Sequence, residues 1–190
     1  MVSDTDNKLA TRALDCVVEL LADHEWEQLT LQQVADRAGV TRVTLWRQLG
    51  GKDELRDALL HRFAEDFRAA LWPVLVQPDN GAQRLEAALR ATCLVIDKHL
   101  VPLMAFPTRF HELHTAHPGA DDPATVVERI LSDGVQDGSL RLPADLRRSA
   151  ELVFSAVFWP YIHLRDNHHW DGETSRELLV GMTMRGLKVS

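Results

Sequence analysis

The sequence has 190 residues, a formal net charge of −7 and 45% hydrophobic residues. That much apolar material can form a buried core, which excludes an intrinsically disordered chain. No apolar run approaches the roughly 18 residues that a membrane span needs, so we expect no membrane partner. The polar start MVSDTDNK does not resemble a signal peptide. Two cysteines among apolar neighbours, Cys16 and Cys93, suit a reducing compartment, and we therefore expect a cytoplasmic protein.

Apolar residues recur with a period of about 3.6 along most of the chain, which predicts an all-α fold of about nine helices. A helix is expected over about 6–24, followed by two short ones over 31–38 and 42–49 and a long one from 52 onward. Further helices are expected over 81–99, 123–136, 143–166 and 171–187. Pro102 and Pro107 predict a short irregular or kinked helix between the fifth and the next of these.

Positive charge is concentrated in one part of this acidic chain. Between positions 28 and 52 there are four cations and one acid, Asp36. DNA phosphates favour basic surfaces, so the overall acidity at first disfavours a nucleic-acid partner. The local surplus instead predicts a small DNA-binding unit attached to an acidic body.

The second and third predicted helices have the spacing of a helix-turn-helix. Thr30-Leu-Gln-Gln is a capping box with Gln33 at the third helical position. Gly39 suits the left-handed residue that ends a helix, and Thr41 caps the next one. In such a motif the second helix lies in the major groove of DNA. The sequence therefore predicts that the helix after Thr41 reads DNA.

Helical geometry divides that second helix into an inner and an outer face. Leu45 and Leu49 point inward, so the outer face is predicted to contact bases through Arg42, Val43, Thr44, Trp46 and Arg47. An arginine fork matches guanine, and Val43 matches a thymine methyl. The predicted contacts to the DNA backbone are Thr30, Thr41, Gln48 and Lys52.

The stretch 31–55, LQQVADRAGVTRVTLWRQLGGKDEL, resembles the signature of the tetracycline-repressor (TetR/AcrR) family of transcriptional regulators. The matching residues are Ala35, Ala38-Gly39-Val40, Thr44-Leu45, an aromatic before Arg47, and Lys52 with Leu55. The resemblance implies a homodimeric, all-helical repressor that binds an operator in double-stranded DNA and leaves it when a small-molecule effector binds. Trp46, Leu49 and Val43 replace the usual tyrosine, phenylalanine and small residue, and Val43 should change the preferred DNA sequence.

Two domains are expected, a DNA-binding domain over 1–53 and a ligand-binding and dimerisation domain over 54–190. The predicted helix over 147–163 is apolar on nearly all sides, so more than one side must be covered. The last helix contains Gly181 and Gly186, which suit close approach to a partner helix. Together with the resemblance, these features predict a homodimer through the last two helices.

A pocket for an effector of unknown identity is expected among the helices of the second domain. Aromatic residues, a methionine and two polar groups are the candidates for its lining: Trp72, His99, Met104, Phe106, Arg109, Phe110, Phe158 and Trp159.

Nine histidines leave an alternative open, a helical regulator that senses a metal or pH. They include one group at positions 111, 114 and 117 and another at 163, 168 and 169. No Cys-x-x-Cys or His-Glu-x-x-His framework accompanies them, so we predict no metal ligands and no cofactor. The sequence also lacks a nucleophile elbow, a phosphate-binding loop and a dinucleotide fingerprint, and we expect no enzymatic activity.

Overall fold

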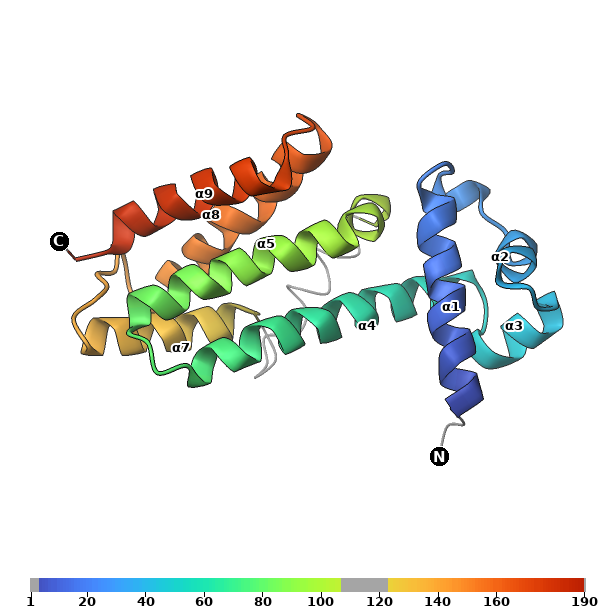
Figure 1. Ribbon diagram of the computed structural model, residues 1–190, viewed down its shortest axis with the longest axis horizontal. Coiled ribbons are helices and arrows are strands. Elements are labelled where there is room, and N and C mark those ends of the chain that lie inside the picture. The colour runs from blue at the N-terminus through green and yellow to red at the C-terminus, as the bar shows by residue number, and fades with distance from the viewer. Residues whose placement is uncertain (1–3, 107–122, 190) are drawn as a thin grey trace. The chain divides into compact units, whose positions relative to one another are not determined.

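The computed structural model describes residues 4–106 and 123–189 (Figure 1). Its α-helices are α1 (Asp4–Leu21), α2 (Leu31–Ala38), α3 (Arg42–Leu49), α4 (Lys52–Leu71), α5 (Gly81–Ala105), α7 (Pro123–Gln136), α8 (Leu146–Asp166) and α9 (Gly172–Leu187). Two 3-10 helices, η1 (Trp26–Gln28) and η2 (Trp72–Val76), follow α1 and α4. The all-α prediction is confirmed, with eight α-helices in the described ranges. None of these helices is long and apolar enough to cross a membrane.

The predicted end of the fifth helix near residue 99 corresponds to a break within α5, which continues through Pro102 to Ala105. His99 has a non-helical backbone (φ −115°, ψ 16°), so the helix is kinked there instead of ending. Pro102 explains the kink, since it cannot donate a hydrogen bond to the carbonyl four residues earlier and its ring crowds that carbonyl. The rest of the helix predicted around Pro107 lies outside the described residues.

The chain divides into two compact units, Met1–Phe63 with Val101–Phe110, and Ala64–Leu100 with His111–Ser190. The functional boundary between residues 53 and 54 stays a prediction, whereas the division between the compact units falls within α4, after its first turns. The reason is that Leu55 and Leu59 of α4 and Phe106 pack into the core of the first unit. The Phe106 ring meets the Trp26 ring edge-on, with centroids 4.9 Å apart.

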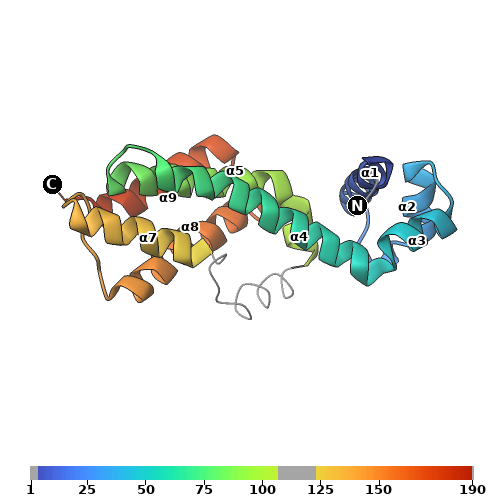
Figure 2. The same cartoon turned by 90° about the horizontal axis from the view of Figure 1, so that it is seen from below.

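In the second unit α7, α8 and α9 run side by side (Figures 1 and 2). Asp97 of α5 accepts hydrogen bonds from two side chains of α8 and so connects the two helices. Tyr161 Oη donates a hydrogen bond to Asp97 Oδ2 (2.6 Å), and Arg165 Nε donates to Asp97 Oδ1 (2.7 Å). Burial is the main cause that raises the pKa of Tyr161, with the Asp97 carboxylate adding to it, so the phenol stays protonated.

The start of α5 is completed by residues far away in the sequence. Gly81 N donates to Asp137 Oδ2 (2.7 Å), and Ala82 N donates to Ser139 Oγ (3.0 Å). Hydrogen bonds from Ser139 and Gly81 lower the pKa of Asp137. These contacts satisfy two of the amides that a helix start leaves without partners.

Close contact between α5 and α7 at this point depends on glycine. A Cβ placed on Gly81 would lie 2.2 Å from the Cα of Gly134. We expect Gly81→Ala to lower the free energy of unfolding by about 3 kcal/mol, because backbone atoms must move apart. Urea denaturation measures this. Gly51→Ala is the control, since its Cβ would approach only the movable Glu54 carboxylate, at 3.1 Å. Equal stability of the two variants would contradict the packing argument.

Candidate DNA-binding face

The two short helices are fixed by local caps, as the sequence predicted. Thr30 Oγ1 accepts a hydrogen bond from Gln33 N (3.2 Å), and Gln33 Oε1 accepts one from Thr30 N (2.8 Å), which completes the capping box. Thr41 Oγ1 accepts from Thr44 N (3.1 Å) at the start of α3. Side-chain caps of this kind typically contribute about 1 kcal/mol each.

Two glycines, one before and one after α3, fix the direction of this helix. Gly39 ends α2 in the left-handed region (φ 65°, ψ 36°), and Gly50 ends α3 at φ 79°, ψ −150°. The second conformation is essentially restricted to glycine. A side chain at either position would strain the backbone and turn α3 away from its present direction.

The predicted reading face of α3 is exposed. Leu45 is fully buried in the core of the first unit, whereas Val43 is 70% and Trp46 61% exposed. Arg42, Arg47 and Gln48 are exposed as well, and Thr44 is half-buried. Large apolar side chains left in solvent beside arginines are typical of a surface that binds a partner.

The arginines of this unit differ in what they contact. Arg37 of α2 pairs with Glu19 of α1, with Nη2 2.8 Å from Oε2. Arg42 and Arg47 form no ion pair within the described part of the chain. The guanidinium groups of Arg42 and Arg47 are therefore available to bind an anionic acceptor from another molecule.

Some predicted DNA contacts already have partners within the chain. Thr30 Oγ1 donates to Gln33 Oε1 (2.8 Å), and the hydroxyl oxygens of Thr41 and Thr44 lie 2.9 Å apart. These hydroxyl groups would have to change or share partners to donate to a phosphate.

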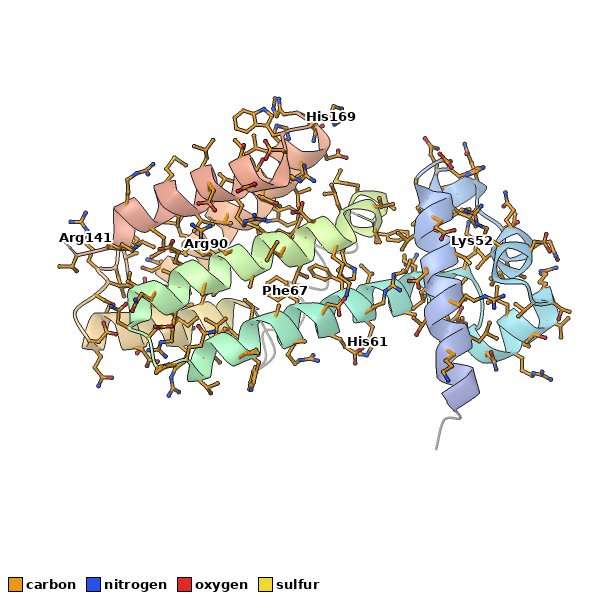
Figure 3. The ribbon with its side chains drawn as sticks, viewed as in Figure 1. Lys52, His61, Phe67, Arg90, Arg141 and His169 are labelled. Carbon is orange, nitrogen blue, oxygen red and sulfur yellow. The ribbon has the colours of Figure 1, made fainter. Side chains whose placement is uncertain are left out.

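Lys52 has a structural role that the sequence did not reveal. Its Nζ donates to the carbonyl of Trp26 (2.6 Å) and lies 4.8 Å from the centroid of the Trp26 ring. Figure 3 shows Lys52 at the start of α4. The ammonium thus fastens η1 to α4, and a phosphate contact would have to share it with this carbonyl. The spacing of 26 residues between the partners left no local signal for the contact.

The predicted ligand residues do not all lie in one unit. Met104 and Phe106 belong to the first unit, and the other described candidates belong to the second. Phe158 is fully buried, with Trp159 edge-on at 5.1 Å and Phe154 stacked on it at 5.0 Å. Phe154 and Phe67, 6.0 Å apart, extend this aromatic cluster and were missed by the sequence analysis.

The remaining candidates have separate surroundings. His99 is 2% exposed, and its Nε2 lies 2.7 Å from Asp66 Oδ2 on α4. Trp72 lies half exposed on η2. Arg109 and Phe110 fall outside the described residues. Across the described ranges, no group of three or more His, Cys, Asp or Glu side chains is arranged to hold a metal ion.

Residues 14–59, which contain every predicted DNA contact and both caps, match the family described as bacterial regulatory proteins, tetR family. This helix-turn-helix part of the chain is therefore that of a tetR-family regulatory protein. The match confirms the resemblance seen in the sequence and supports a DNA-binding transcriptional regulator.

Relatives of known name match most of the length of this chain. The HTH-type transcriptional repressor KstR2 of Rhodococcus jostii (strain RHA1) is 26% identical over 175 residues, 82% of each chain. The structure of a SmeT–triclosan complex has a TM-score of 0.76 at 18% identity, covering 96% of this chain and 93% of SmeT. AibR in complex with isovaleryl coenzyme A and operator DNA has a TM-score of 0.68 at 19% identity, covering 92% and 97%. The two structures show that the fold is shared.

Proposed function

We propose that this TetR-family protein is a homodimeric repressor that binds a palindromic operator through α3 of each copy and leaves it when a small molecule binds. The exposed face of α3 carries the proposal, because capped helix ends and a buried Leu45 hold its arginines, Val43 and Trp46 toward solvent. DNA reading is assigned to residues 1–53, and effector binding and dimerisation to 54–190.

Each side chain of this face has a chemical counterpart in the major groove. Arg42 or Arg47 donates two parallel hydrogen bonds to guanine O6 and N7, and Val43 packs on a thymine methyl. Trp46 donates to phosphate oxygens, together with Gln48, Thr30, Thr41, Thr44 and Lys52 where their present partners allow it. Base contacts then select the sequence, and phosphate contacts fix the register.

Exposed apolar side chains on α8 and α9 support the homodimer. Leu152, Leu178 and Met182 are all more than half exposed. Gly186 has no atom within 4 Å of the position of a Cβ, so nothing in the described chain requires a glycine there. A second copy packed on α8 and α9 would cover these side chains. Gly186 would then allow a helix of that copy to approach the backbone of α9 closely.

An apolar small molecule is the effector class that fits best. The cluster of Phe67, Phe154, Phe158 and Trp159, whose phenylalanines are buried, makes the interior of the second unit apolar. The complexes of SmeT with triclosan and of AibR with isovaleryl coenzyme A hold ligands with apolar parts on the same fold. Trp72, His99, Met104, Phe106, Arg109 and Phe110 remain predicted contacts for it.

Selection from random double-stranded DNA, followed by fluorescence anisotropy on the enriched sequence, tests the proposal. We expect a palindrome whose half-sites have centres about 34–36 Å apart, one helical turn. Isovaleryl coenzyme A and triclosan are the first probes for release. Enrichment of a single asymmetric half-site would overturn the dimeric mode of binding. Retention on DNA with both probes would count against these two effector chemistries while leaving the DNA contacts in place.

A further inference from the structure

Two histidine side chains face each other at the end of α8. His163 lies in the last turns of this helix, and His168 lies in the connection that leads to α9. Both are exposed, and their Nε2 atoms are 3.2 Å apart. The pair lies outside the DNA-binding face and does not depend on the proposed function.

The relative placement of the two rings matches that of two ligands on one metal ion. Imidazole nitrogens bind zinc at about 2.0–2.1 Å, so two nitrogens at the observed separation subtend an angle of about 100° at a shared ion. That angle lies between those of octahedral and tetrahedral centres. The N–N separation therefore leaves room for one ion at normal bond lengths to both rings.

The spacing of the ring centres supports the same geometry. The centroids are 4.9 Å apart and the ring planes are inclined by 80°. The centroid of an imidazole ring lies about 1.2 Å from Nε2. Two rings that both point at one ion would therefore have centroids about 5 Å apart. Two rings aligned on a straight N–H···N hydrogen bond of the observed length would have centroids about 5.6 Å apart. The observed centroid distance matches the first arrangement, in which both nitrogens point at a shared ion, better than the straight hydrogen bond.

The backbone holds His168 in this position from both sides. Asn167 N donates to the carbonyl of His163, and Trp170 N donates to that of Leu164, each at 3.0 Å. Arg165, which is bound to Asp97, also donates to the carbonyl of Trp170. His169 has φ 54°, the only positive φ of a non-glycine residue in the described ranges, and Figure 3 shows this residue at the turn. Such a conformation persists only where the surroundings hold it in place.

We propose that His163 and His168 form a two-imidazole chelate for a late divalent transition metal, Cu²⁺ most strongly and Ni²⁺ or Zn²⁺ less so. Imidazole nitrogen suits these ions, and Cu²⁺ stands highest in their affinity order. Because the pair is exposed, water fills the remaining coordination positions. When the ion binds, each ring carries its proton on Nδ1 and offers the lone pair of Nε2 to the ion, which fastens the connection between α8 and α9.

Isothermal titration of the full-length protein with CuCl₂, NiCl₂ and ZnCl₂ tests the proposal. We expect one Cu²⁺ per chain, and His163→Ala or His168→Ala should each weaken its binding about tenfold or more. His169→Asn is the matched control, because it removes an exposed neighbouring imidazole outside the pair while asparagine tolerates the left-handed backbone there, and it should bind as the unchanged protein does. Electron paramagnetic resonance of the Cu²⁺ complex should show two nitrogen donors in the unchanged protein and one in either single variant.

Thermal unfolding adds a readout that does not depend on counting sites. Cu²⁺ should raise the midpoint of the unchanged protein and of His169→Asn but not that of the double variant His163→Ala/His168→Ala. Undiminished Cu²⁺ binding in the double variant, or equal loss in His169→Asn, would overturn the assignment. Failure of the unchanged protein to bind any of the three ions would also overturn it.

Discussion

Arg47→Ala should weaken operator binding about tenfold to a hundredfold and relax the preference for one base pair, as expected when a side chain that reads guanine is lost. Arg47 is exposed on α3 and has no ion-pair partner in the described chain, so its removal leaves the folded unit intact. Anisotropy titrations against the selected operator and its single-base variants, repeated at several salt concentrations, measure both effects.

Arg37→Ala is the matched control for this substitution. It removes the same charge from the same unit, but the Arg37 guanidinium pairs with Glu19 on the surface formed by α1 and α2. We expect little change in its affinity and none in its base preference. If both variants lost affinity equally at every sequence, Arg47 would be a general electrostatic contact and the reading face would be wrongly assigned.

Lys52→Ala should give a different pattern. A contact to phosphate alone would weaken all DNA sequences alike and lower the salt slope by about one. Since Lys52 Nζ also binds the carbonyl of Trp26, the substitution should lower the unfolding midpoint as well. Loss of stability with unchanged salt dependence would assign Lys52 to the fold alone.

The second large effect is expected for Met182→Glu, which places a charge on an apolar side chain of α9 that is 61% exposed. In a dimer formed by α8 and α9 this charge would be buried without a partner, so the copies should separate. Operator affinity should then fall by about a hundredfold or more, because one copy reaches only one half-site. Analytical ultracentrifugation and anisotropy measure the two consequences.

Leu94→Glu controls for the general effect of a charge on an exposed apolar residue. Leu94 lies on α5 and is 56% exposed, comparable with Met182. It should leave both the dimer and the operator affinity unchanged. A Met182→Glu protein that sediments as a dimer, or a Leu94→Glu protein that separates into single copies, would place the interface elsewhere.

Features that depend on neighbouring residues could be predicted from the sequence. The capping box at Thr30, the left-handed Gly39 and the cap at Thr41 involve residues three to five apart, so the pattern alone identifies them. The outward direction of α3 followed in the same way from the period of the helix and the buried Leu45.

Features that depend on distant residues could not be predicted. The contact of Lys52 with Trp26 and the packing of Phe106 in the first unit need the folded arrangement of several helices. The kink in α5, by contrast, followed from a local feature, because Pro102 removes a hydrogen bond within the helix. The sequence places His163 and His168 close together along the chain, but it does not show that their rings face each other in the fold.

The cap that Asp137 and Ser139 supply to α5 has a consequence for how the second unit folds. The amides of Gly81 and Ala82 find these partners only after 56 or more further residues have been joined to the chain. During synthesis Asn80 and Gln83 can already cap this turn locally, but the amides of Gly81 and Ala82 reach their partners only when the end of α7 has emerged and docked. The exchange of these two amides with solvent deuterium consequently reports on the docking of α7, a non-local event that a helix start rarely records.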